Sequence, residues 1–255
     1  MRLGSPDDDS TATPLRGWLS DVFLPALLEG EDEGVAALAR RLGHRAFVAD
    51  PVLGRGEGAG VEQHLRALSS WLTKRGATFE RSAFLTGTDR DATLGRLRYR
   101  EGDREHERPA AVVAEKRRAR EVELRLYFAP VSGGVGAPRV QRPADAEEAA
   151  LPGVVTDLLA ALGRGDATAA LETFETTGAL EDALGQRFGR GEGALAQYLA
   201  ASGVGRGGLT VSRDGVADDG RSCALELTVQ RFAGRSVEPT GGLAVFERGD
   251  SGLIR

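Results

Sequence analysis

The sequence has 255 residues, a formal net charge of −5, 41% hydrophobic residues and 28% charged residues, which is enough apolar material for two modest cores in a globular protein. The acidic balance argues against nucleic acid as a main partner, and no apolar stretch reaches the length that a membrane-spanning helix needs. The single cysteine, Cys223, excludes an intramolecular disulfide and any cysteine-based metal cluster, and it fits a reducing cytoplasm.

Helices are predicted first along the chain. Residues 1–13 are polar and rich in Asp, without the basic-then-apolar order of a signal peptide, so we expect a disordered leader there. Apolar residues at helical spacing then predict three helices, over residues 14–29, 34–47 and 61–72. Pro25 is expected to kink the first of these helices or to begin a second one.

The apolar period then changes to two, which predicts strands over residues 78–85, 92–100, 109–116 and 120–128. In the last of these strands, apolar side chains occupy one face from Val122 to Phe128. Glu123, Arg125 and Tyr127 occupy the other face. Helices followed by antiparallel strands indicate an α+β fold.

The rest of the chain repeats this order. Residues 129–151 are rich in Pro, Gly, Ala and acidic residues, which is the composition of a linker. Beyond them, helices are predicted near residues 152–163, 166–176 and 193–202, and strands near residues 209–213, 222–232 and 241–248.

An internal duplication accounts for this repetition. The pentapeptide Gly-Arg-Gly-Glu-Gly at residues 54–58 returns at residues 189–193, which is 135 positions further on (189 − 54 = 135). We therefore predict two tandem domains, over residues 14–128 and 152–255, packed as an intramolecular pseudo-dimer. The second copy has no counterpart of Leu124–Phe128, so we expect its last strand to be incomplete. Whether the C-terminus is native or truncated is left open by the sequence.

Each copy also has a helix, a turn of glycine and an acidic residue, a second helix, an acidic position, a Gly loop, a third helix and then strands. The residues that carry this order include Ala49-Asp50-Pro51-Val52, Gly165-Asp166, Glu181-Asp182 and the strand Glu123–Tyr127. Each half thereby resembles the nuclear transport factor 2-like fold, in its SnoaL-like and ketosteroid-isomerase-like bacterial branch. The resemblance implies a curved antiparallel sheet wrapped by helices into a cone, with an apolar pocket inside.

Asp50 is the strongest candidate for chemistry. The resemblance places it where ketosteroid isomerases carry their general base, so it could move a proton next to a carbonyl or activate water on an epoxide. A local interpretation is equally open, because Asp before Pro commonly sits in a turn and accepts hydrogen bonds from nearby backbone amides. Asp182 is the matching residue of the second domain.

Other candidates surround the expected pocket of the first domain. His64 lies beside the apolar stripe of the third helix, as an acid, base or donor, or as a boundary residue bonded to the Gly loop. Trp71 lies on the same side and is expected in the pocket wall or the core. Tyr99 and Tyr127 could donate a phenolic hydrogen bond into the cone, although strand tyrosines usually serve packing.

Two functions follow from the resemblance. One is binding of a small apolar molecule, with isomerase, polyketide cyclase or epoxide hydrolase/cyclase chemistry at Asp50 and neither a cofactor nor a metal. The alternative is a non-catalytic ligand-binding or assembly module whose pockets are filled by side chains. For both functions we expect neither nucleic acid nor a membrane as a partner, and a homodimer is open. Phe128 follows Tyr127 where the family signature has Asp or His, which favours the alternative. An open pocket facing Asp50 would favour catalysis.

Overall fold

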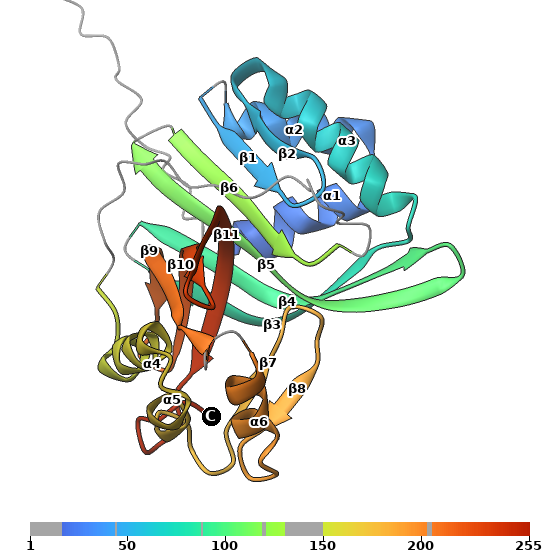
Figure 1. The fold of residues 1–255 in the computed structure, drawn as a ribbon. Helices are drawn as coiled ribbons and strands as arrows, with labels where there is room; N and C mark the ends of the chain where they lie inside the picture. Colours follow the sequence, from blue (N-terminus) through green and yellow to red (C-terminus); the bar gives the residue numbers. More distant parts are fainter. Residues whose placement is uncertain (1–16, 44, 88, 119–120, 131–149, 203–205) are drawn as a thin grey trace, which may run out of the picture.

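The computed structural model describes residues 17–43, 45–87, 89–118, 121–130, 150–202 and 206–255 (Figure 1). It is an α+β structure in which each half has helices followed by a curved antiparallel sheet. The predicted leader and nearly all of the predicted linker lie outside the described residues, so the domain boundaries stay predictions. Within the described residues, every helix is too short or too polar to cross a membrane.

The helices of the first half form one layer. They are the π-helix η1 (Leu19–Phe23), α1 (Leu24–Glu29), α2 (Asp32–Leu42), the short 3₁₀ helix η2 (Gly58–Gly60) and α3 (Val61–Thr73). Pro25 lies in the first turn of α1, where its missing N–H costs no hydrogen bond, so the helical path continues through it. The second helix was predicted five residues too long. It ends at Leu42, and Phe47–Asp50 form a strand that is buried on both faces and therefore shows no alternation.

The first half has a six-stranded sheet. Its strands are β1 (Phe47–Asp50), β2 (Gly54–Glu57), β3 (Thr78–Thr86), β4 (Arg90–Glu101), β5 (Arg104–Arg118) and β6 (Glu121–Phe128). Their order is β2-β1-β6-β5-β4-β3, antiparallel except for the parallel pair β1–β6. The four long strands agree with the sequence pattern, and the short strands β1 and β2 were missed.

The second half contains α4 (Gly153–Arg164), α5 (Ala167–Glu172), β7 (Ala179–Glu181), β8 (Arg187–Gly189), α6 (Ala194–Ala201), β9 (Leu209–Asp218), β10 (Ser222–Phe232) and β11 (Arg235–Glu247). Its strands form a three-stranded sheet, β11-β10-β9, and a β7–β8 hairpin. Near the C-terminus, Phe174 and Ile254 form a parallel bridge.

The pairing registers of the strands are repeated between the two halves. Ala92 pairs with Leu85 and Val113, and Ala224 pairs with Ala217 and Val245, each of them 132 positions further on (224 − 92 = 132). In both halves the last glycine of the repeated pentapeptide lies just before the third helix. Gly58 has φ 57° and Gly193 has φ 74°, left-handed values that favour glycine.

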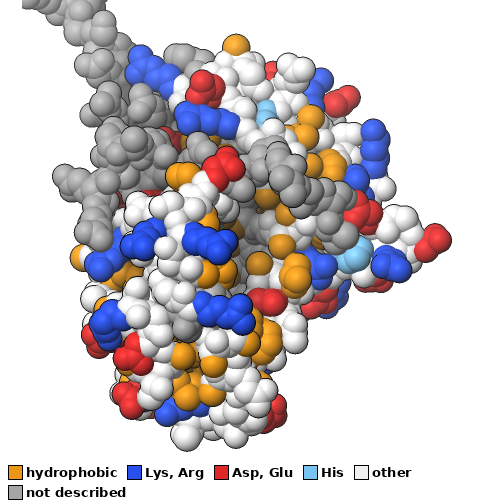
Figure 2. All heavy atoms as spheres, in the orientation of Figure 1, with side chains coloured by type: hydrophobic (Ala, Val, Ile, Leu, Met, Phe, Trp, Pro, Cys, Tyr) orange, Lys and Arg blue, Asp and Glu red, His pale blue; other side chains and the backbone are white. Residues whose placement is uncertain are grey.

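The two halves pack against each other through their sheets. Each half has its own buried core under its helices. A third cluster joins the outer faces of the two sheets, with Leu85, Ala92, Leu94, Ala111 and Val113 from the first half and Ala217 and Ala224 from the second. In Figure 1, α1–α3 accordingly lie on one side of the large sheet and the second half lies on the other. The face in Figure 2 carries basic and acidic side chains interspersed with apolar ones.

Candidate functional site

Asp50 and His64 come together beneath α3. Strand β1 ends at Asp50, and alternation places Asp50 on the same face as Val48, which belongs to the core under the helices. The Asp50 carboxylate is fully buried. Its Oδ1 accepts hydrogen bonds from the amides of Val52 at 2.7 Å and Leu53 at 2.9 Å, and its Oδ2 lies 2.7 Å from His64 Nε2. Both oxygens of the carboxylate are therefore engaged by the protein itself.

The pentapeptide loop makes this contact possible. A Cβ on Gly56 would lie 2.5 Å from the Cβ of His64, so only glycine lets α3 approach β2 this closely. That approach seats the imidazole over Asp50 and leaves the His64 side chain 8% exposed. The geometry thus contains both local interpretations from the sequence: a turn that Asp50 holds through backbone amides, and a histidine fixed beside the Gly loop.

Tyr99 and Trp71 belong to a separate aromatic cluster. The Tyr99 ring centroid lies 5.5 Å from that of Trp71, and Trp71 lies 5.9 Å from Phe128. The Tyr99 hydroxyl donates to the Ala129 carbonyl at 3.4 Å. Because β6 and β5 stand between β1 and β4, the strands that carry Asp50 and Tyr99 are about 14 Å apart. The three residues predicted as catalytic are thus divided between two places.

The interior between α3 and the sheet is filled with side chains. Leu65, Leu68 and Leu72 of α3 face Leu97, Val112, Leu124 and Leu126 of the strands, and all of them are buried in one core. Side chains of this size leave a close-packed interior rather than a ligand cavity. Side chains therefore fill the space between helix and sheet, as the non-catalytic alternative expects.

Tyr127 lies on the other face of β6, at the interface of the halves. Its hydroxyl donates to Glu226 Oε1 of β10 at 2.6 Å. Arg125, which is 1% exposed, contacts Glu226 Oε1 through Nε at 2.5 Å and Glu115 through Nη2 at 2.5 Å. Arg90 donates to Glu226 Oε2 at 2.7 Å. We call these five residues the interface cluster.

Electrostatics keeps Glu226 ionised within the interface cluster. Burial alone would raise the pKa of Glu226, but the charge and hydrogen bonds of Arg125, a hydrogen bond from Tyr127 and the charge of Arg90 hold it below its usual value. Burial together with the charge of Glu226 raises the pKa of Tyr127 well above its usual value, so the phenol remains a donor. Sequence reasoning missed this cluster, although Arg125 and Glu226 each stand between two leucines of a strand.

Asp182 occupies a turn in the second half. Its Oδ1 accepts from the amides of Leu184 and Gln186, both at 2.9 Å, between β7 and β8. Burial raises the pKa of the nearby Tyr198, and the charge of Asp182 adds to that shift. Leu199 stands where the first half has His64, so the second half has no imidazole at this position.

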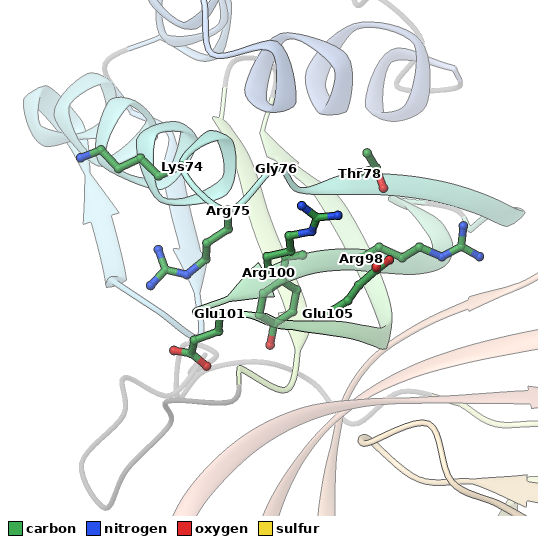
Figure 3. Close-up of a pocket in the computed structure, with 10 residues that line it drawn as sticks. Lys74, Arg75, Gly76, Thr78, Arg98, Arg100, Glu101 and Glu105 are labelled. Carbon is green, nitrogen blue, oxygen red and sulfur yellow. The ribbon is translucent and has the colours of Figure 1, made fainter.

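A cleft of about 700 Å³ lies where α3 turns into β3, beside the β4–β5 hairpin (Figure 3). Its lining residues are Lys74, Arg75, Gly76, Thr78, Arg98, Tyr99, Arg100, Glu101, Gly102 and Glu105. On β4, Arg98 pairs with Glu107 and Glu80, and Arg96 pairs with Glu181 of the second half.

Comparisons with known proteins give structural neighbours alone. No family model matches the sequence. No curated protein matches it either. The chain is similar to an NTF2-like protein of unknown function from Cytophaga hutchinsonii, with 16% identity, 48% of this chain and 95% of that chain covered, and a TM-score of 0.34.

Two further solved structures are similar to it. One is the epoxide hydrolase/cyclase-like enzyme SalBIII of salinomycin pyran ring formation, with 14% identity, 45% of this chain and 89% of that chain covered, and a TM-score of 0.34. The other is a hypothetical protein with a ketosteroid isomerase-like fold from Catenulispora acidiphila, with 11% identity, 48% of this chain and 90% of that chain covered, and a TM-score of 0.36. The structural neighbours are thus NTF2-like and ketosteroid isomerase-like proteins, each covering about half of this chain.

Proposed function

We propose that the chain is a non-catalytic small-molecule-binding protein whose ligand site is the cleft beside α3. The observation that carries the proposal is the state of Asp50. A general base must accept a proton from its substrate through a free lone pair within hydrogen-bond reach. Two backbone amides and His64 already occupy the Asp50 carboxylate, beneath a helix whose apolar side chains fill the space above the sheet.

The cleft supports the binding part of the proposal. Its volume of about 700 Å³ falls within the roughly 300–1,000 Å³ that small-molecule sites occupy. Tyr99 joins its wall to the aromatic cluster with Trp71, so the wall rests on packed side chains of the first core. The polar lining differs from the apolar pocket that the resemblance implies, and it favours a ligand with a polar or charged group.

A second candidate keeps the chemistry at Asp50. The 2.7 Å contact with His64 favours it, because a carboxylate that orients an imidazole is a recurrent arrangement for proton transfer. Isomerisation, cyclisation or epoxide opening of a small apolar molecule would then take place beneath α3. This candidate requires His64 to swing away from Asp50 and the core side chains of α3 to make room.

Ligand mapping on the whole chain separates the two candidates. A fragment set of aromatic acids, amides and alcohols would be titrated into ¹⁵N-labelled protein while amide chemical shifts are followed by NMR. We expect shifts at residues 74–78 and 98–105. Shifts centred on residues 50–64, or turnover of a ketosteroid or epoxide substrate by the unmodified protein, would overturn the proposal in favour of the second candidate. A set in which no fragment shifts either region would overturn both.

A further inference from the structure

The cleft carries an excess of positive charge on an acidic chain. Four cations line it, Lys74, Arg75, Arg98 and Arg100, against the carboxylates of Glu101 and Glu105. This gives the lining two net positive charges, whereas the whole chain has a net charge of −5. A concave surface of one sign concentrates the field and attracts ions of the opposite sign. The modest excess matches a single anionic group better than a polyanion.

Arg75 and Arg100 are joined through their backbones, but their guanidinium groups point to different sides of the cleft (Figure 3). The Arg100 amide donates to the Arg75 carbonyl at 2.9 Å, which joins the end of β4 to the turn after α3. The Arg75 guanidinium lies 4.2 Å from the Trp71 ring centroid and donates to the Trp71 carbonyl at 3.3 Å. Its Nε is buried without an acceptor among the described residues. The Arg75 side chain is therefore held against Trp71, and it does not share the space that Arg100 faces.

Arg100 differs from its neighbour Arg98 in having its charge available. Arg98 Nε donates to Glu107 at 2.6 Å, and its Nη2 lies 3.2 Å from Glu80. Among the residues that the structure describes, Arg100 forms no side-chain hydrogen bond or ion pair. Figure 3 shows its guanidinium reaching toward Gly76 and Thr78. A planar guanidinium without a carboxylate partner is a ready bidentate donor to an oxyanion.

The duplication supplies an internal comparison. At the turns of the cleft, Gly76 and Gly102 both face open space, with nothing within 4 Å of an added Cβ. In the second half, a Cβ on Gly207 would lie 2.7 Å from the nitrogen of Gly234, so the corresponding turns are in contact. The last pair before the hairpin turn is Phe232–Arg235 in the second half and Glu101–Arg104 in the first, so Arg231 occupies the register position of Arg100. Arg231 donates to the Gly234 carbonyl at 3.2 Å, so among the described residues the open turns and the cation without a side-chain bond are found together in the first half.

We infer that the cleft recognises a small organic anion, whose carboxylate or phosphate group is bound by Arg100. This inference rests on the proposed function, because it names the ligand class of the same cleft. The recognition is a charge-assisted, bidentate hydrogen bond from a guanidinium to an oxyanion. The carboxylates of Glu101 and Glu105 at the same cleft set the limit of one anionic group per ligand.

The test compares ligands that differ only in charge. Benzoate, benzamide and inorganic phosphate would each be titrated at low salt into the ¹⁵N-labelled full chain, with the amides of Gly76 and Gly102 as reporters. We expect benzoate to bind at least about tenfold more tightly than benzamide, which corresponds to one charge-assisted hydrogen bond. Binding of phosphate as tight as that of benzoate would identify the oxyanion alone as the ligand, and weaker phosphate binding would identify an organic carboxylate.

A pair of variants with the same charge change completes the test. Arg100→Gln removes the unpaired cation of the cleft, and Arg104→Gln removes an exposed arginine of the same hairpin that does not line it. We expect Arg100→Gln to weaken benzoate binding about tenfold and leave benzamide binding unchanged, with Arg104→Gln within about twofold of the parent. Equal affinities for benzoate and benzamide, or equal losses in both variants, would overturn the inference. Absence of any shift at residues 74–78 and 98–105 would instead refute the proposed function.

Discussion

At the scale of single residues, Asp50 connects three parts of the chain through one carboxylate. It holds the turn after β1 through the amides of Val52 and Leu53, and it holds α3 through His64. A carboxylate that serves as the acceptor for buried donors contributes to stability because its loss leaves those donors unsatisfied. Asp50 is therefore expected to matter for folding whatever its role toward a ligand.

We predict that Asp50→Ala lowers the free energy of unfolding by about 1–3 kcal/mol, because the amides of Val52 and Leu53 and the imidazole of His64 lose a buried acceptor. Guanidinium-induced unfolding followed by circular dichroism would measure the change. Glu57→Ala provides the control, since Glu57 is exposed and pairs with the exposed Arg55, and its loss should cost at most about 0.5 kcal/mol. Similar losses in the two variants would contradict the structural role of Asp50.

The sequence could identify Asp50 and His64 as individual candidates, but it could not place them 2.7 Å apart. Their contact depends on how closely α3 approaches β2, which Gly56 decides. Nothing in the helical pattern around His64 reports that distance. For Tyr127 the evidence was present in the sequence: it shares a strand face with Glu123 and Arg125, opposite the apolar face that lines the core. That alternation places the tyrosine on the outer face of the sheet.

At the scale of elements, length and alternation decided what could be predicted. The four strands β3 to β6 were predictable because eight or more residues alternate between a core face and an outer face. Strand β1 has four residues buried on both sides, and β2 consists largely of glycines, so neither shows a period of two. The cleft could not be foreseen, because it is the space between two turns, and the arginines of β4 alternate as they would on a solvated face.

Strand β10 carries a buried charged residue, Glu226, among apolar neighbours. Glu226 is 3% exposed and receives hydrogen bonds from Arg90, Arg125 and Tyr127. We predict that Glu226→Gln destabilises the chain by about 3–5 kcal/mol, because it leaves two buried guanidinium groups with one remaining buried carboxylate. Glu247→Gln on β11 is the matched control, as Glu247 is exposed and pairs with the exposed Arg255. Chemical denaturation of the two variants measures the difference, and equal stability would contradict the prediction.

At the scale of the whole molecule, the interface cluster links the stability of the two halves to acid. The folded-state pKa of Glu226 lies below its ordinary value of 4.5. Its contribution to stability is therefore fully present above pH 4.5 and is lost as the pH falls from there through the lowered folded-state pKa. Unfolding in acid is therefore coupled to proton uptake by this carboxylate.

We predict that the unmodified chain loses stability more steeply than Glu226→Gln as the pH falls below 4.5. Denaturation midpoints measured at half-unit steps from pH 7 to pH 3 would give the two slopes. The difference between the two proteins should be constant above pH 5, because Glu226 is ionised there in both the folded and the unfolded chain. Parallel curves over the whole range would show that Glu226 is not the group that couples proton uptake to unfolding.

Most residues of the interface cluster belong to the first half, and this asymmetry affects which substitutions each half can accept. In a twofold-symmetric dimer each interface residue appears twice, so any substitution alters both subunits together. Here four members of the cluster come from the first half and Glu226 alone comes from the second, and the register position of Glu226 in the first half is Leu94. Since the two halves lie in one chain, their contact does not have to be self-complementary, and the cleft can belong to the first half alone. We therefore expect calorimetric titrations to give one anion bound at the cleft per chain, where a symmetric pair of identical halves would bind two.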